Sequence, residues 1–242
     1  MVKSIMLRAI ILYEVIIYLI STLVYGGALI TSVYTGIWFF QHLPLPVFLL
    51  IIPNLIIVFI LTLIFEVGFI RLLVPKMKEG FYEAPGRSMF YFWTLNLTLN
   101  RLLFFDPIKN IILYSATLRF FTFLALGAKF SYATSVSANT VFTDMQMFSV
   151  GKNSVIGAWT MISGHYINKG KLGLGMIVIG ENVNIGTHCH IAPNVTIGNN
   201  TWVGAECRIS PMVYIGSGCS IEPLTIIPPG TRINDGENYP KK

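Results

Sequence analysis

Aliphatic residues recur at every sixth position through the last third of the chain. The ten positions of this series are Ile179, Ile185, Ile191, Ile197, Val203, Ile209, Ile215, Ile221, Ile227 and Ile233. A period of six keeps no single face of an α-helix, and it differs from the two-residue alternation of an ordinary strand. Short strands joined by turns explain it, if three units close one turn of a triangular prism and each aliphatic side chain points inward. Such a prism buries its core only between neighbouring turns, so it requires a stack.

Three further regularities fit the prism. Small or β-branched residues stand four positions after most of the aliphatic ones: Val183, Cys189, Val195, Thr201, Cys207, Val213, Cys219, Thr225 and Thr231. Glycine often follows the aliphatic residue directly, as at Gly180 and Gly186, which we interpret as a need for turn dihedrals that other residues resist. Pro193, Pro211 and Pro229 recur 18 residues apart, the length of three units. The three cysteines are predicted to be small buried residues rather than a catalytic thiol or a disulfide.

The six-residue series extends backwards with interruptions. Its earlier members, which include a slip of two residues, are Phe130, Val136, Phe142, Val150, Ile156 and Ile162. The series is broken at 163–178, which predicts either one irregular turn or a loop that leaves the prism. Ordered loops on rigid scaffolds tend to carry function. We therefore predict a β-helix domain over 128–242, with its chemistry near the break.

The preceding part of the chain is strongly apolar. No charged residue occurs from Val15 to Phe65, a stretch of 51 residues, whereas a bilayer-spanning helix needs about 20. The prolines at 41–46 indicate a turn. We predict two transmembrane helices, near 10–38 and 47–70. A cleaved signal peptide and a buried soluble core both explain so long an uncharged stretch less well.

Charges at the ends of these segments predict their orientation. Lys3 and Arg8 precede the first segment, and Arg71, Lys76 and Lys78 follow the second, whereas the turn between them has no Lys or Arg. Both ends of this multi-pass integral membrane protein are therefore predicted to be cytoplasmic. The net charge is +6, and basic residues flank the apolar segments. This arrangement fits contact with anionic lipid headgroups better than binding of nucleic acid.

Two segments, 88–105 and 108–127, are apolar but contain isolated charges. Arg101 and Arg119 disfavour simple central spans. We predict two amphipathic helices that lie in the membrane interface or re-enter it, with two further spans as the alternative. The predicted membrane region is accordingly 1–127.

The repeat resembles that of a known family. The run IGENVNIG at 179–186 and its successors resemble the hexapeptide-repeat acyltransferases, which form left-handed parallel β-helices that are usually trimeric. Short runs at 126–129, 143–144, 150–151 and 164–165 resemble the membrane-attached hexapeptide domain of poly-lysine synthetase-like proteins. The resemblance implies transfer of an acetyl or other acyl group from acyl-CoA to a hydroxyl or amine. With the apolar segments, it suggests a membrane-associated acceptor, such as a lipid-linked sugar or an envelope precursor.

The same resemblance implies site residues. His165 matches the position of the histidine that acts as general base in the family, and imidazole suits proton transfer near neutral pH. Asp144 matches a family aspartate that would orient His165 or the acceptor. The alternatives are a solvated loop histidine and an aspartate that only shapes a turn.

Coenzyme A would lie in a groove between prisms. Family backbone contacts to the coenzyme fall at positions that match Thr187 and Ala205, and Arg208 and Arg232 are candidates for its phosphates. Solvated surface charges are the alternative for the two arginines.

Other functions remain open at this point. His188 and His190 are predicted on one outer face of the prism, and a zinc site shared with His165 is conceivable, although no metal is expected. A carbonic-anhydrase-type zinc enzyme is a weaker alternative because the histidine spacing differs from that of such relatives. A non-catalytic trimeric membrane scaffold is the other alternative.

Overall fold

The chain folds into two compact units. The computed structural model describes residues 2–52, 54–84, 88–105 and 108–240, with side chains from residue 15 onward except that of residue 50. The units are Met1–Ile70 and Arg71–Lys242. The division falls well before the predicted boundary at 127/128, because the segment after Ile70 packs with the β-helix. The side chains of Lys3 and Arg8, used to predict orientation, lie outside the described part.

The first unit is helical. Its helices are α1 (Val2–His42), α2 (Leu45–Ile51) and α3 (Asn54–Leu73), the last of which runs into the second unit. Two stretches are long and apolar enough to cross a membrane: Val15–His42, with 28 residues, and Asn54–Leu73, with 20. They overlap the two predicted segments, and the chain turns between them near the predicted prolines.

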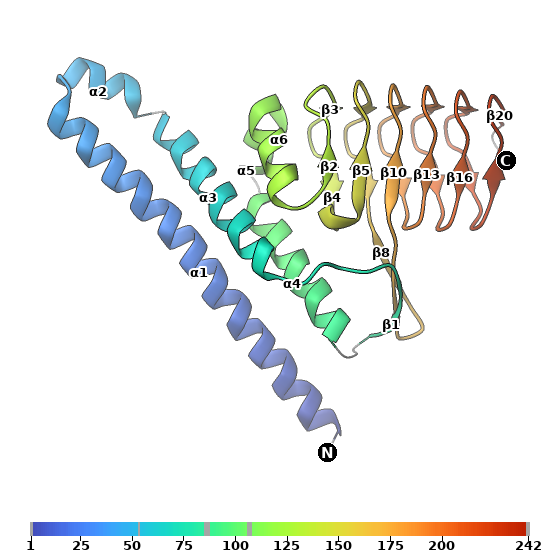
Figure 1. Cartoon of the computed structure of the whole chain (residues 1–242), viewed down its shortest axis with the longest axis horizontal. Helices are drawn as coiled ribbons and strands as arrows, with labels where there is room; N and C mark the ends of the chain where they lie inside the picture. Colours follow the sequence, from blue (N-terminus) through green and yellow to red (C-terminus); the bar gives the residue numbers. More distant parts are fainter. Residues whose placement is uncertain (1, 53, 85–87, 106–107, 241–242) are drawn as a thin grey trace. The chain divides into compact units, whose positions relative to one another are not determined.

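The second unit contains three parallel sheets, and each sheet is formed by strands from successive coils of the chain (Figure 1). The first sheet comprises β2 (Lys129–Phe130), β5 (Phe148–Val150), β10 (Ile177–Ile179), β13 (Thr196–Ile197), β16 (Tyr214–Ile215) and β19 (Arg232–Ile233). The second comprises β3 (Ser135–Val136), β6 (Val155–Ile156), β11 (Asn184–Ile185), β14 (Trp202–Val203), β17 (Ser220–Ile221) and β20 (Asn238–Tyr239). The third comprises β4 (Val141–Phe142), β7 (Met161–Ile162), β12 (His190–Ile191), β15 (Arg208–Ile209) and β18 (Ile226–Ile227). This is the predicted parallel β-helix, and its geometry fits the left-handed type.

The interior follows the six-residue series. Ile185 pairs with Val203 and Ile191 with Ile209, 18 residues apart, and all four side chains are buried. The two-residue slip is occupied by a 3₁₀-helix, η1 (Met145–Met147). The three cysteines are buried and unbridged, as predicted. A hydrogen bond with the Cys207 thiol, together with burial, raises the pKa of the Cys189 thiol, so Cys189 is a poor candidate for a nucleophile.

The glycines that directly follow the aliphatic residues serve a different purpose from the predicted one. Left-handed backbone dihedrals occur three residues after the aliphatic position, for example at Asn182 and His188, both with positive φ. Gly186 instead lies where neighbouring turns meet, and a Cβ there would stand 2.5 Å from the backbone nitrogen of Ala205. These glycines therefore allow neighbouring coils of the prism to pack closely. The prediction that they supply left-handed dihedrals in the β-turns was wrong.

Three short helices cover the N-terminal end of the β-helix: α4 (Ser88–Leu103), α5 (Ile108–Tyr114) and α6 (Ala116–Ala125) (Figure 1). With 16, 7 and 10 residues they are shorter than the roughly 20 that a span needs, which argues against two further spans. Phe123 of α6 is buried against the rings of Phe130 and Phe142, two of the first three inward residues of the prism. Arg119, also buried, donates to the carbonyl oxygen of Thr134 at 3.0 Å. The helices thus form the cap of the β-helix core.

The break at 163–178 is a hairpin that leaves the prism. Strands β8 (His165–Asn168) and β9 (Lys171–Leu174) pair antiparallel, and β1 (Gly80–Glu83) joins the far side of β9. Leu172 and Leu174 are buried with Met77, Trp93 and Met147. The hairpin is therefore held by β1 and α4. Of the two predicted possibilities, the structure shows a loop that leaves the prism and not an irregular turn of it.

Candidate active site

His165 and Asp144 form a hydrogen-bonded pair at the base of the hairpin. His165 is the first residue of β8, and Asp144 immediately precedes η1. The Nδ1 atom of His165 lies 2.6 Å from Oδ2 of Asp144. The Asp144 side chain is 1% exposed and that of His165 is 20% exposed. The structure therefore brings the two predicted catalytic residues together.

The Asp144 carboxylate has donors on both oxygens. The indole Nε1 of Trp93 donates to Oδ1 at 2.9 Å, and Thr143 Oγ1 donates to Oδ2 at 2.6 Å, beside the contact with His165. A buried charge is costly unless such partners compensate it. The approach depends on Gly164, because a Cβ there would stand 2.7 Å from Cβ of Met147 and 3.0 Å from Cβ of Asp144.

The second ring nitrogen of His165, Nε2, is not used in the contact with Asp144. With Nδ1–H directed at a carboxylate, Nε2 is the nitrogen that can accept a proton. Within the described parts of the chain, no side-chain or backbone group is hydrogen-bonded to it. The histidine is thus oriented as the base of a His–Asp pair is.

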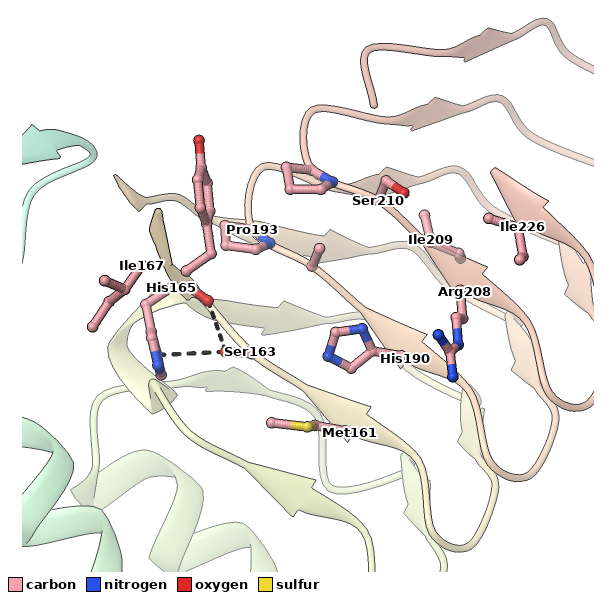
Figure 2. A pocket seen from close by; sticks show the side chains of 13 residues that line it. Met161, Ser163, His165, Ile167, His190, Pro193, Arg208, Ile209, Ser210 and Ile226 are labelled. Atoms are coloured by element: carbon pink, nitrogen blue, oxygen red, sulfur yellow. Dashed lines mark hydrogen bonds between the residues drawn. The ribbon is translucent and has the colours of Figure 1, made fainter. Parts of the chain in front are cut away.

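A groove of about 640 Å³ begins at His165 and follows the outer face of the third sheet. Its residues, drawn as sticks in Figure 2, are Met161, Ser163, His165, Tyr166, Ile167, His190, Ala192, Pro193, Arg208, Ile209, Ser210, Pro211 and Ile226. Ser163 lies between the prism and the hairpin, and its Oγ donates to the carbonyl oxygen of His165 at 3.0 Å. The groove can therefore hold an extended ligand with one end at His165.

Arg208 supplies positive charge to this groove. It is the Cα partner of His190 on the neighbouring strand, and the two side chains lie side by side in Figure 2. Burial, and to a smaller extent the charge of Arg208, lowers the pKa of His190. At neutral pH the groove therefore contains an arginine cation beside a neutral imidazole.

The Arg208→Gln substitution is expected to raise the pKa of His190. A nearby cation opposes protonation of an imidazole, so removal of the guanidinium makes protonation easier, while burial still opposes it. The titration of the His190 ring can be followed by NMR of the histidine-labelled protein. An unchanged midpoint would show that burial alone lowers the pKa.

The other sequence-predicted residues lie apart from the groove. Thr187 and Ala205 stand in the turns that lead into β12 and β15, so they do not line it. Arg232 lies on the first sheet with its guanidinium 4.3 Å from the Tyr214 ring centroid. His188 occupies a turn and stacks on Trp159, so it does not share a face with His190, contrary to the prediction.

Trp93 is a site residue that the sequence analysis missed. It lies on α4, which was predicted as an interfacial membrane helix. Its spacing with Asn96 and Asn100, which repeats at three and four residues, marks one polar stripe of the helix. That stripe was the available signal.

Within the described residues, no group of three or more His, Cys, Asp and Glu side chains is placed to hold a metal ion. His165 has Asp144 as its partner, while His190 faces Arg208 and His188 faces Trp159. The three histidines thus have separate surroundings in this chain.

Residues 176–211 match the family described as bacterial transferase hexapeptide (six repeats). This segment covers two turns of the regular stack, including β12 and part of the groove. Over these residues, the six-residue repeat is therefore similar to that of the bacterial hexapeptide transferases.

Solved structures with similar folds include several acetyltransferases. A maltose O-acetyltransferase from Clostridium difficile is 18% identical, over 64% of this chain and 87% of its own, with a TM-score of 0.48. A perosamine N-acetyltransferase variant from Caulobacter crescentus, in complex with CoA and GDP-perosamine, is 17% identical over 58% of this chain and 61% of its own, with a TM-score of 0.25. The acetyltransferase domain of PglB from Neisseria gonorrhoeae is 18% identical over 58% and 63%, with a TM-score of 0.24. This chain spans less than two thirds of the latter two. No curated protein matches the sequence.

Proposed function

We propose that this chain is a membrane-attached acyltransferase that moves an acetyl or other acyl group from acyl-CoA to a hydroxyl or amine. The observation that carries the proposal is the Asp144–His165 pair at the end of a groove on a hexapeptide-repeat β-helix. A paired histidine with one unengaged ring nitrogen suits general-base catalysis. The hexapeptide repeat favours acyl transfer over other reactions that use a general base.

The proposed reaction gives each of these groups a role. Nε2 of His165 takes the proton of the acceptor as its oxygen or nitrogen attacks the thioester carbonyl. The tetrahedral intermediate then collapses, the carbon–sulfur bond breaks, and the proton passes from the imidazolium to the leaving thiolate. Asp144 holds the Nδ1–H tautomer and stabilises the imidazolium that forms.

The coenzyme would lie across β12 and β15. Thr187 and Ala205 offer backbone groups in the turns that precede β12 and β15, whereas His165 follows the C-terminal end of β7. Arg208 lies between these positions and would meet the coenzyme phosphates. A homotrimer, as is usual for such β-helices, would close the groove with a neighbouring prism.

The acceptor is proposed to be membrane-associated, such as a lipid-linked sugar or an envelope precursor. Two apolar stretches precede the β-helix, and only residues 74–79 separate the second from β1, which pairs with the catalytic hairpin. This short connection favours an acceptor at the bilayer. The flanking charges favour a cytoplasmic position of both termini, on the side of the membrane where acyl-CoA is available.

Turnover by the full-length protein tests the proposal. Protein in lipid nanodiscs is incubated with radiolabelled acetyl-CoA and either a membrane lipid extract or soluble sugars and amines. We expect release of CoA and transfer of label to a component of the lipid extract. Absence of CoA release with all acceptors would contradict the acyltransferase assignment.

Binding of CoA separates the enzyme from a non-catalytic scaffold. Calorimetry is expected to detect binding, and Arg208→Gln to weaken it by about tenfold, the value of one hydrogen bond to a charged group. Arg101→Gln, which alters an exposed arginine of α4 outside the groove, is the matched control. Lack of binding would favour the scaffold, and zinc found by elemental analysis would favour the metalloenzyme.

A further inference from the structure

The polar stripe of α4 is directed at the segment that contains Asp144. Asn100 donates through its side-chain nitrogen to the carbonyl oxygen of Thr143, and Asn96 is hydrogen-bonded to Gln146. Trp93 reaches Asp144 itself. Three side chains of one helix thus contact three residues within 143–146.

Trp93 contacts both members of the catalytic pair. Its indole N–H donates to Oδ1 of Asp144 at 2.9 Å, and its ring meets the His165 ring edge-on, with centroids 4.8 Å apart. It is buried in the cluster that holds β9, together with Leu172 and Leu174. Asp144 and His165 are therefore both in contact with the same side chain, which has only two rotatable torsions.

We propose that Trp93 is a positioning residue for the Asp144–His165 pair. The indole N–H holds Oδ1, so Oδ2 faces Nδ1 of His165, and the ring limits rotation of the imidazole. A carboxylate that lost this donor could rotate within its site, and the imidazole would spend less time in the productive orientation. Trp93 acts through Asp144 and does not touch the reacting atoms.

This inference rests on the proposed function, and a double-mutant cycle tests it. Trp93→Phe removes the N–H but keeps an aromatic ring, so we expect kcat to fall about tenfold with little change in KM for acetyl-CoA. In an Asp144→Ala background the same change is expected to alter kcat by less than about twofold, because its target is absent. Trp202→Phe, on the outer face of the second sheet, is the control and should leave kcat unchanged.

The outcomes are distinct. A tenfold loss that persists in the Asp144→Ala background would show that Trp93 only supports the fold, and an unchanged kcat in Trp93→Phe would also overturn the proposal. If the wild-type protein has no acyltransferase activity, the proposed function fails, and the positioning role is judged by a measurement without turnover.

That measurement is the indole N–H resonance of Trp93 in protein labelled with ¹⁵N-tryptophan. The chain has four tryptophans, so the resonance can be assigned through single substitutions of the other three if Trp93→Phe does not fold. We expect the Trp93 proton to move upfield in Asp144→Ala, as a donor does when it loses a charged acceptor. An unmoved resonance would overturn the proposal whatever the activity.

Discussion

Replacement of His165 with alanine is expected to lower kcat for acyl transfer by roughly two to four orders of magnitude, the contribution typical of a general base. Asp144 is hydrogen-bonded to Nδ1, so in the proposed mechanism Nε2 takes the acceptor proton, and alanine leaves no group to do so. Binding of acetyl-CoA should change little, because His165 stands at one end of the groove. Steady-state rates of CoA release, with saturating acceptor, give kcat directly.

His188→Ala is the matched control for this measurement. His188 stacks on Trp159 in a turn outside the groove, so its loss should leave kcat within about twofold of wild type. Equal rates in the wild-type and His165→Ala proteins would remove His165 from the mechanism. A comparable loss in both variants would instead indicate a general effect on folding, which a thermal melt would reveal.

The β-helix could be predicted because its pattern is local. Each six-residue unit specifies its own strand, turn and inward residue, so Ile185 or Ile209 can be assigned without knowledge of any distant contact. Even the slip between Phe142 and Val150 was visible as a change in spacing. Its cause, the 3₁₀-helix at Met145–Met147, was not, because the short segment has no periodicity to read.

Only some residues of the site could be predicted from the sequence. His165 and Asp144 came from a family resemblance, and their contact depends on how the hairpin leaves the prism. Trp93 was missed for a physical reason: an apolar helix with a polar stripe suits a membrane interface and a protein cap equally well. Which of the two it joins is decided by long-range packing against residues some 50 positions later, and no local pattern records that.

Phe123→Ala is expected to destabilise the β-helix unit by about 3–5 kcal/mol, the usual cost of removing a buried phenylalanine ring. Phe123 is fully buried on α6, and its ring lies 4.4 Å from that of Phe130 and 5.0 Å from that of Phe142 between centroids. Its loss would open a cavity between the cap and the first turn of the prism. In a unit of this size the melting temperature should fall by roughly 10 °C.

Phe121 provides the control, because it lies on the same helix, two positions earlier, and is 48% exposed. Phe121→Ala removes an equal ring at nearly the same sequence position, yet it should shift the melting temperature far less. If 88–127 were a membrane segment independent of the prism, neither substitution would affect the thermal unfolding of the β-sheets followed by circular dichroism. A large effect at Phe123 alone would therefore show that the unit that unfolds with the β-sheets begins ahead of the repeat and includes α6.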